Sequence, residues 1–416
     1  MSISTRLNRL VSALVARRSR LPRPVNAALD RIVAGGGGPL GRVAQDVLGR
    51  LSGGGARAGS RPPVPGTPVR LFVGPTNYAG QGYLWARAVE REIPGVGAVN
   101  MVAEVEHGFR FPADDAVPVA TYLLSRPWQE EQRRYVEQFT HVLVEAERPL
   151  LGRLHGGDAF VEARSLQESG LRVAMMCHGT DVRLPSRHRD THPWSPFHDD
   201  PAAAATLEDV ARKNIDGLAS LGAPVFVSTP DLLDDVPDAT WCPVVVDAAR
   251  WSPSARVLER PRPLVVHVPS SSSVKGTQLI APVLERLAER GTIDFRYVEG
   301  VAAADMPALY GEADIVLDQF RIGSYGVAAC EAMAAGRVVV GHVSPAVRSH
   351  VLRTTGLELP IVEATPDSLE EVLTSVLDDR ERHRRRAARG PEFVADVHDG
   401  RTSSHALRPF LLEART

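Results

Sequence analysis

From Pro68 onwards, short apolar runs alternate with stretches of helical periodicity. The runs that predict buried strands are residues 69–74, 141–145, 171–176 and 224–228, then 264–268, 294–298, 313–318 and 337–341. The helical stretches between them are residues 83–92, 127–139 and 159–169, then 277–289, 304–311 and 325–335. Such alternation indicates parallel sheets with helices on both faces, and here it occurs twice. We therefore expect an α/β protein with two Rossmann-like domains.

The first 66 residues break this pattern. They are rich in arginine, with only Asp30 and Asp46 as acids, and they end in a Pro-rich linker. Two short amphipathic helices are expected there, around residues 7–15 and 40–51. A basic amphipathic helix favours contact with anionic lipid, so residues 1–51 could hold the protein on a membrane surface. The alternative is an arm that packs on the body of the protein or on a partner.

The pattern also sets the expected domain boundaries. A basic, Gly/Pro-rich extension covers residues 1–66, and a first Rossmann-like domain covers residues 67–248. A second Rossmann-like domain covers residues 249–400. The last residues, 401–416, predict a C-terminal helix that could cross back to the first domain. A length of 416 residues agrees with more than one hydrophobic core.

Composition adds little to the fold but narrows the function. Apolar residues make up 44% and charged residues 24%, as in ordinary globular proteins. The formal net charge of −2 gives no reason to expect nucleic acid. Cys177, Cys242 and Cys330 lack metal-ligand spacing, which favours free thiols in a reducing compartment. We expect a cytoplasmic protein, at the inner face of the membrane if the N-terminal segment binds lipid.

The most informative segment is residues 314–340. An apolar strand ends at Asp318, a glycine-containing turn follows, and a helix with the single acid Glu331 begins near Tyr325. Burying a carboxylate without a partner costs several kcal/mol, so we expect a ligand to bind Glu331. The helix N-terminus meets the carboxyl edge of a sheet, where phosphate-bearing ligands bind in open α/β folds. The segment therefore indicates a nucleotide-sugar site.

Here the sequence resembles the retaining glycosyltransferases of family four, which have the GT-B fold of two Rossmann-like domains facing across a cleft. These carry a Glu-x7-Glu signature followed by Ala-Met-Ala-x-Gly and an apolar strand, and residues 331–340 match the second half. The resemblance implies that Glu331 holds the ribose of the nucleotide. The first glutamate, which contacts the donor sugar, falls at Gly323. Asp318 and Gln319 are the nearest candidates to replace it.

Other residues of the second domain complete the expected donor site. Lys275 follows the strand at 264–268 through a serine-rich loop and precedes Gly276, and a lysine there suits a diphosphate leaving group. The alternative is a surface lysine on a flexible loop. His267, at the end of that strand, is as well explained by packing as by ligand binding. Further donor contacts are expected from three residues of the turn, Ser324, Tyr325 and Gly326.

In the first domain, His178 follows an apolar strand within His-Gly-Thr-Asp. The resemblance implies that this histidine reaches the donor sugar, and Gly80 and Gly82 in a glycine-rich loop are expected to approach the donor. Asp181 and Arg183 are candidates on the acceptor side. The cluster His188, His192 and His198, with its aspartates, imitates metal-ligand spacing, but its prolines favour a mobile acceptor-side loop instead.

We therefore expect a metal-independent retaining glycosyltransferase, with His178, Lys275 and Glu331 as its catalytic residues. It would move a sugar from a nucleoside-diphosphate donor to a hydroxyl of a glycan, glycolipid or natural product, as in polysaccharide biosynthesis, without a cofactor. The alternative is a catalytically idle nucleotide-sugar-binding partner of the same fold, which Gly323 and the serine loop would explain. An epimerase of this fold is less favoured by the two motifs.

Overall fold

The structure is a computed structural model that describes residues 61–105, 111–251 and 257–413, together with Arg9 and Ala13. The two expected N-terminal helices and their membrane contact therefore lie outside the described residues. The chain forms two compact units. The first contains the chain up to Val182, residues 212–226 and the C-terminal end from Leu407, and the second contains residues 183–211 and 227–406.

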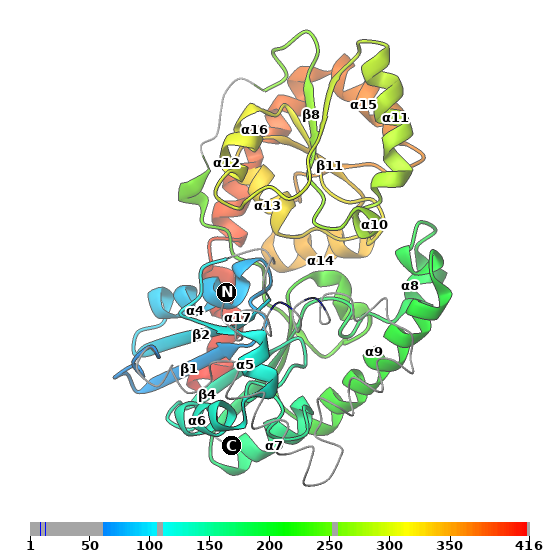
Figure 1. Cartoon of the computed structure of the whole chain (residues 1–416). Helices are drawn as coiled ribbons and strands as arrows, with labels where there is room; N and C mark the ends of the chain where they lie inside the picture. Colours follow the sequence, from blue (N-terminus) through cyan, green and yellow to red (C-terminus); the bar gives the residue numbers. More distant parts are fainter. Residues whose placement is uncertain (1–8, 10–12, 14–60, 106–110, 252–256, 414–416) are drawn as a thin grey trace. The chain divides into compact units, whose positions relative to one another are not determined.

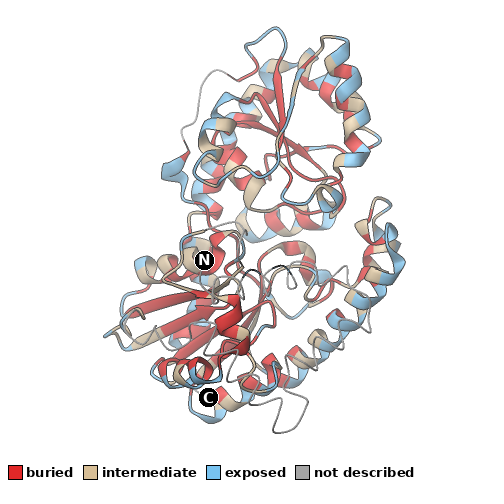
Figure 2. Cartoon of the chain, in the orientation of Figure 1, coloured by how far each residue is buried: buried red, intermediate tan, exposed pale blue. Residues whose placement is uncertain are grey.

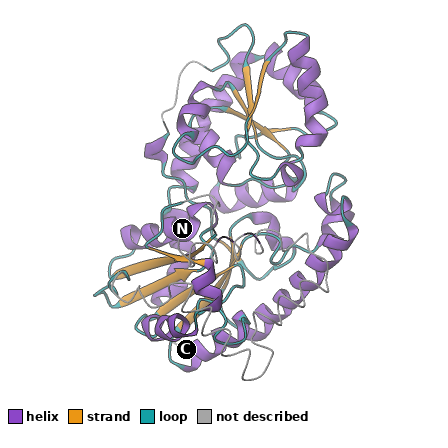
Figure 3. Ribbon diagram, viewed as in Figure 1, coloured by secondary structure: helices purple, strands orange, loops and turns teal. Residues whose placement is uncertain are grey.

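A seven-stranded sheet organises the first part of the chain, with the order β3-β2-β1-β4-β5-β6-β7 (Figures 1 and 3). The strands are β1 (Val69–Gly74), β2 (Val96–Glu104), β3 (Asp115–Pro118), β4 (His141–Glu145), β5 (Arg172–Cys177), β6 (Val225–Val227) and β7 (Thr240–Trp241). The pairs from β3 to β5 are parallel. Parallel strands are covered on both faces, which is why β1, β4 and β5 consist of continuous apolar runs.

Helices connect and cover these strands. They are η2 (Tyr78–Gly80), α4 (Gln81–Glu92), α5 (Val119–Leu124), α6 (Arg126–Val136), α7 (Ala159–Glu168) and α17 (Arg401–Leu412). α17 brings the C-terminal end of the chain into the first unit, where the ring of Phe410 lies 5.1 Å from that of His141 on β4. The long α9 (Pro201–Leu221) belongs to the first unit only from Arg212 onwards.

The second unit is built on a five-stranded sheet with the order β12-β11-β10-β8-β9. Its strands are β8 (Leu264–His267), β9 (Asp294–Tyr297), β10 (Ile315–Leu317), β11 (Val338–Gly341) and β12 (Val362–Glu363), all paired in parallel. Its helices are α8 (Pro185–Thr191), α10 (Ser272–Lys275), α11 (Thr277–Glu289), α12 (Met306–Glu312), α13 (Val327–Ala334), α14 (Pro345–Thr355), α15 (Leu369–Asp378) and α16 (Arg380–Val397). Short 3-10 turns are η3 (Pro196–His198), η4 (Pro230–Asp234) and η5 (Ala248–Arg250).

The core of the second unit lies between this sheet and the pair α11 and α15, which Figure 1 shows on one side of the strands. Leu284 and Leu373 from the helices and Val265 and Val340 from the strands are fully buried there. Figure 2 shows the buried residues gathered on the strands and on the helix faces that cover them. Helical spacing of the apolar residues, as in α11, is what places one face of each helix on the sheet.

In both sheets the strand order reverses at one point, because later strands are added on the opposite side of the first strand. In the first sheet β1 lies between β2 and β4, and in the second β8 lies between β9 and β10. In open α/β sheets, ligands bind outside the carboxyl ends of the strands that flank such a point. The segments that follow β1, β4, β8 and β10 are therefore the candidate ligand-binding segments.

These observations confirm the expected α/β class with two parallel sheets. Among the helices of the described residues, none combines the length and the apolar character that crossing a bilayer requires.

Candidate functional site

The second unit holds an ammonium group at the carboxyl ends of two neighbouring strands. Lys275 ends α10 after β8, and Nζ donates a hydrogen bond to Oδ1 of Asp318, which follows β10. The turn after Lys275 requires glycine, because Gly276 has a φ of +82° and a Cβ there would lie 2.9 Å from Cγ of Arg321. The structure thus brings together two residues that the sequence had selected separately.

Glu331 lies on α13, the helix that follows β10 and its turn. Its side chain is partly buried, and its carboxylate has no hydrogen-bond or ion-pair partner among the described residues. Burial raises the pKa of Glu331 to about 7, against the opposing charge of Arg250. The buried Tyr310 has its pKa raised by burial and by the charges of Glu331 and Asp318. Both carboxylates therefore act electrostatically on one buried tyrosine.

The turn between β10 and α13 is organised by Gln319. Its Oε1 accepts hydrogen bonds from the backbone N–H groups of Arg321 (3.1 Å) and Ile322 (2.8 Å). Its Nε2 donates to the carbonyl oxygens of His342 (2.7 Å) and Ser324. The amide of Gln319 is fully used in holding the turn, so it has no free hydrogen-bonding group to replace the missing glutamate.

The three predicted donor-binding residues of the turn differ in their surroundings. Oγ of the buried Ser324 makes no well-formed hydrogen bond within the described residues, but it faces the carboxylate of Asp231 and helps to lower the pKa of that group. Tyr325 is also buried, and its hydroxyl lies 3.3 Å from Nε2 of His398, so it packs within the unit. Gly326 precedes α13, and a Cβ there would meet open space. The backbone at Gly326 is therefore the position in this turn that a ligand can approach closely.

Arg321 is a residue of this turn that sequence reasoning missed. Its side chain is buried, and its guanidinium donates to both carboxylate oxygens of Asp199 at 2.6 and 2.7 Å. It also donates to the carbonyl oxygens of Trp194 (2.6 Å), Ser195 (2.9 Å) and Ser273 (3.1 Å). One arginine thus fixes the turn after β10, the loop before Lys275 and the segment around η3 to one another.

His178 occupies the corresponding place in the first unit, directly after β5. Its Nε2 lies 3.4 Å from Oε1 of the fully buried Glu145, the last residue of β4. The rings of Tyr78 and Trp85 lie 5.2 and 5.6 Å from the imidazole. Glu145 also accepts the backbone N–H of Asn77 at 3.0 Å, which ties it to the loop after β1. Sequence reasoning missed Glu145, because it reads as the end of an apolar strand.

The fold itself favours glycine at the two glycine positions of the loop after β1. Gly80 has a φ of +75°, which favours glycine, and it precedes α4. A Cβ at Gly82 would lie 2.6 Å from Nδ2 of Asn100 and 2.8 Å from Oε2 of Glu145. Gly82 therefore lets α4 pack directly on Glu145. Contact of either glycine with a donor stays a prediction.

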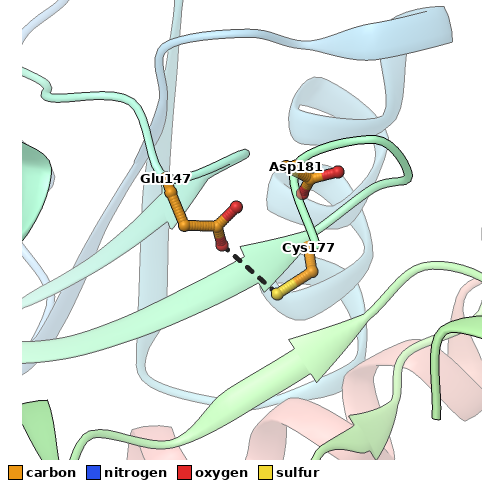
Figure 4. A group of neighbouring side chains, drawn as sticks. All are labelled: Glu147, Cys177 and Asp181. Carbon is orange, nitrogen blue, oxygen red and sulfur yellow. Dashed lines mark hydrogen bonds between the residues drawn. The ribbon is translucent and has the colours of Figure 1, made fainter. Parts of the chain in front are cut away.

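Asp181 holds the His178 turn and belongs to a group with Glu147 and Cys177 (Figure 4). Its carboxylate accepts the backbone N–H groups of His178 (2.7 Å) and Gly179. Sγ of Cys177 donates to Oε1 of Glu147 at 3.2 Å, and one ligand atom from each of the three side chains lies within 4.8 Å of the others. Such a group could hold a metal ion. Burial, followed by the charge of Asp181, raises the pKa of Glu147 well above its ordinary value, so a proton on Glu147 relieves the same repulsion.

Arg183 lies in the second unit and forms a buried ion pair with Asp231. Burial is the largest influence and would raise the pKa of Asp231, but the charge of Arg183 and the hydrogen bonds from Ser324, Arg183 and Thr229 together lower the pKa below its ordinary value. The guanidinium is thus engaged within its own unit. The acceptor-side roles of Asp181 and Arg183 stay predictions.

The histidine cluster at residues 188–198 belongs to the second unit, with His198 in η3 and His192 in the turn between α8 and η3. His188 lies in α8, and its ring stacks on that of His192 at 4.2 Å. Nδ1 of His188 lies 2.8 Å from Oγ of Ser195, and Nε2 lies 3.3 Å from the carbonyl oxygen of Ile322. Both ring nitrogens of His188 are therefore used in packing this segment on the turn after β10.

The sequence matches no family model and no curated protein. Solved structures, however, share the fold over most of the chain. Sucrose-phosphate synthase from Thermosynechococcus elongatus is 13% identical, with a TM-score of 0.55, over 82% of this chain and 97% of that one. A glycosyltransferase from Rickettsia africae is 11% identical, with a TM-score of 0.52, over 84% of this chain and 100% of that one. Anabaena HepE, solved in complex with UDP and glucose, is 13% identical, with a TM-score of 0.50, over 83% of this chain and 99% of that one.

These likenesses confirm the GT-B fold that the sequence indicated.

Proposed function

We propose that this chain is a glycosyltransferase that moves a sugar from a nucleoside-diphosphate donor to a hydroxyl acceptor, with retention at the anomeric carbon. The observation that carries the proposal is the carboxylate of Glu331. It lies partly buried on α13 without a polar partner in the described residues, and α13 follows β10, whose carboxyl end carries Asp318 and its partner Lys275 beside β8, where the strand order of the second sheet reverses. A carboxylate for ribose hydroxyls and a cation for a diphosphate are the two groups that such a donor requires.

The proposed chemistry needs positioning and charge stabilisation more than a protein nucleophile. The bond between the anomeric carbon and the diphosphate oxygen breaks, and the acceptor oxygen bonds to the same face of that carbon. The acceptor proton passes to an oxygen of the leaving diphosphate. Lys275 neutralises the charge that develops on the diphosphate, and Asp318 holds the ammonium in place. In this proposal the reaction uses no metal ion.

The comparisons support the same class of reaction. Among the similar structures with TM-scores of 0.50 or above, one is named a sucrose-phosphate synthase and one a glycosyltransferase. A third was solved in complex with UDP and glucose. His178 in the first unit stays the candidate contact for the donor sugar. Its variant His178→Ala should lower kcat while the affinity for a free nucleoside diphosphate stays unchanged.

Calorimetric titration with nucleoside diphosphates and their sugars tests the proposal. Glu331→Ala should weaken donor binding by at least a factor of about 100, because the lost ribose contacts are hydrogen bonds to a charged group. Glu371→Ala is the matched control, since Glu371 is exposed on α15 of the same unit. Donor affinity that survives the change at Glu331 would show that the site is elsewhere.

The second candidate is a binding protein of the same fold without turnover. Gly323, in place of an acid next to the donor turn, is the observation that favours it. Purified protein that binds a nucleotide sugar tightly, yet neither hydrolyses nor transfers it with any of a panel of hydroxyl acceptors, would support this alternative.

A further inference from the structure

The space beside Gly323 is filled by another residue. Gly323 lies in the turn between β10 and α13, with a φ of +74°. A Cβ at this position would lie 2.8 Å from Cδ2 of His192 and closer still to its Nε2. A glutamate side chain therefore cannot occupy position 323 while His192 stays where it is. The glycine and the imidazole form one structural unit, although they are far apart in the sequence.

His192 is held at this place from several directions. Its ring stacks on that of His188 at 4.2 Å, and His188 in turn lies 3.3 Å from the carbonyl oxygen of Ile322. Beyond His192, the bonds of Arg321 to Trp194, Ser195 and Asp199 fasten the same segment to the turn. The position of His192 is thus fixed by contacts within the second unit.

The hydrogen bonds around His192 define its tautomer. The hydroxyl of Thr191 donates to the carbonyl oxygen of Arg187 at 3.0 Å, so its oxygen is left as an acceptor toward Nδ1 of His192 at 2.9 Å. Nδ1 must therefore carry the proton, and Nε2 presents a lone pair. Burial, followed by the charge of His342, lowers the pKa of His192, which keeps the ring neutral at pH 7. Nε2 makes no hydrogen bond with any of the described residues.

The neighbouring side chains have other partners. Oδ1 of Asp318 accepts a hydrogen bond from Lys275, and all hydrogen-bonding groups of the Gln319 amide hold the turn. A neutral nitrogen lone pair accepts a hydrogen bond from a hydroxyl group and repels a phosphate oxygen. Nε2 of His192 therefore suits a sugar hydroxyl and does not suit a diphosphate.

We propose that His192 is the residue of the second unit that recognises the sugar of the donor, accepting a hydrogen bond from a sugar hydroxyl through Nε2 beside Gly323. The inference rests on the proposed function, since it assigns a further contact to the same donor. It also gives Gly323 a role, because only glycine leaves room for the imidazole.

The test compares the affinities for a nucleoside diphosphate and for its sugar conjugate in the same variants. His192→Ala should weaken binding of the sugar conjugate about tenfold or more, while the affinity for the free diphosphate stays within a factor of two. His192→Gln should restore part of the affinity, because its amide oxygen also accepts a hydrogen bond. His198→Ala is the control, since His198 is exposed in the same segment.

A second comparison uses the ligand. Donor analogues in which one sugar hydroxyl at a time is replaced by fluorine should include one that weakens binding to the natural protein but not to His192→Ala. Equal losses in both proteins for every analogue, or a sugar conjugate that binds His192→Ala as tightly as the natural protein, would overturn the inference. If the natural protein binds no nucleotide sugar at all, the proposed function fails and the inference falls with it.

A double-mutant cycle checks the link between the two positions. Gly323→Ala should weaken binding of the sugar conjugate by displacing the imidazole, and the same change in the His192→Ala protein should weaken it much less. Additive effects of the two substitutions would contradict the proposed arrangement, whatever the fold tolerates at position 323.

Discussion

Nε2 of His178 lies 3.4 Å from Oε1 of Glu145, and Oε2 of the same carboxylate accepts the backbone N–H of Asn77 at 3.0 Å. One buried acid therefore orients the candidate catalytic histidine and holds the loop after β1. This arrangement links the ends of β4 and β5 to the loop that the sequence had selected for its glycines.

Glu145→Gln tests this link. The amide keeps the shape of the side chain but loses the charge that favours one orientation of His178. We expect kcat to fall by about tenfold to a hundredfold, as for other groups that orient a functional histidine. The free energy of unfolding should fall by about 1–3 kcal/mol, because buried N–H groups lose a charged acceptor. A kcat equal to that of the natural protein would show that Glu145 serves folding alone.

Gly82→Ala tests the close packing of α4 on Glu145. The added methyl group would lie 2.6 Å from Nδ2 of Asn100, so we expect a loss of about 1–3 kcal/mol in the free energy of unfolding. Gly311→Ala in α12 is the control, because a Cβ there meets nothing within 4 Å. In that helix, alanine should be neutral or up to about 1 kcal/mol more stable. Urea denaturation of both variants measures the difference.

Arg321→Ala tests the connection among the three segments of the second unit. Removing the guanidinium leaves buried carbonyl groups without a donor, so we expect a loss of about 2–4 kcal/mol in stability. Limited proteolysis should then cut within residues 188–200 before the rest of the unit. Arg296→Ala is the control, since its ion pair with Glu312 is exposed and should contribute no more than about 1 kcal/mol. Unchanged proteolysis of Arg321→Ala would show that the segment is held by other contacts.

The pKa of Glu331 predicts how donor affinity depends on pH. In the free protein burial raises this pKa to about 7, and ribose hydroxyls bind better to the carboxylate than to the protonated acid. Binding therefore lowers the pKa and releases a proton below pH 7. The apparent Kd should be constant above about pH 8 and should rise by up to tenfold per unit as the pH falls below 7. Titrations of Glu331→Gln across the same pH range should lose this slope, and a persistent slope would assign it to another group.

The group Glu147, Cys177 and Asp181 gives a prediction about cations. Burial, followed by the charge of Glu147, raises the pKa of the Cys177 thiol well above its ordinary value, so the folded protein should react slowly with iodoacetamide at pH 8. If a proton neutralises the group, added Zn²⁺ should leave the Tm unchanged. A bound cation at a hundred times its Kd would instead stabilise the fold by about 2.7 kcal/mol, and Cys177→Ser would abolish the effect.

The two sheets were largely predictable because most of their strands are continuous apolar runs. Strand β1 and helix α11 begin and end at the predicted residues. Strand β2 was missed, since Gly97 and Asn100 interrupt its apolar pattern. The structure explains both: a Cβ at Gly97 would lie 2.7 Å from Oγ1 of Thr67, and Nδ2 of Asn100 lies 3.3 Å from the carbonyl oxygen of Val73. Such tertiary contacts override local propensity.

The candidate site was predictable only in part, and for a related reason. Lys275, Asp318 and Glu331 follow strands or lie in the next helix, so motif position was enough to select them. Arg321 and His192 work through partners distant in sequence, 122 residues away for Arg321 and Asp199. No local pattern marks Arg321, and the sequence offered His192 only as a member of the histidine cluster interpreted as a loop. Gly323, whose departure from the expected glutamate pointed to a compensating residue, led to Asp318 and Gln319 instead.

The path of the chain limits how this protein can be taken apart. It leaves one unit for the other after Val182, Ala211, Phe226 and Ala406. A fragment that stops near residue 250 would lack Phe410, whose ring meets Phe226 and His141. A fragment that starts there would lack Asp199, the partner of Arg321. No single division of the chain gives two fragments that each contain a complete unit. We therefore expect the two units to fold stably only as one polypeptide.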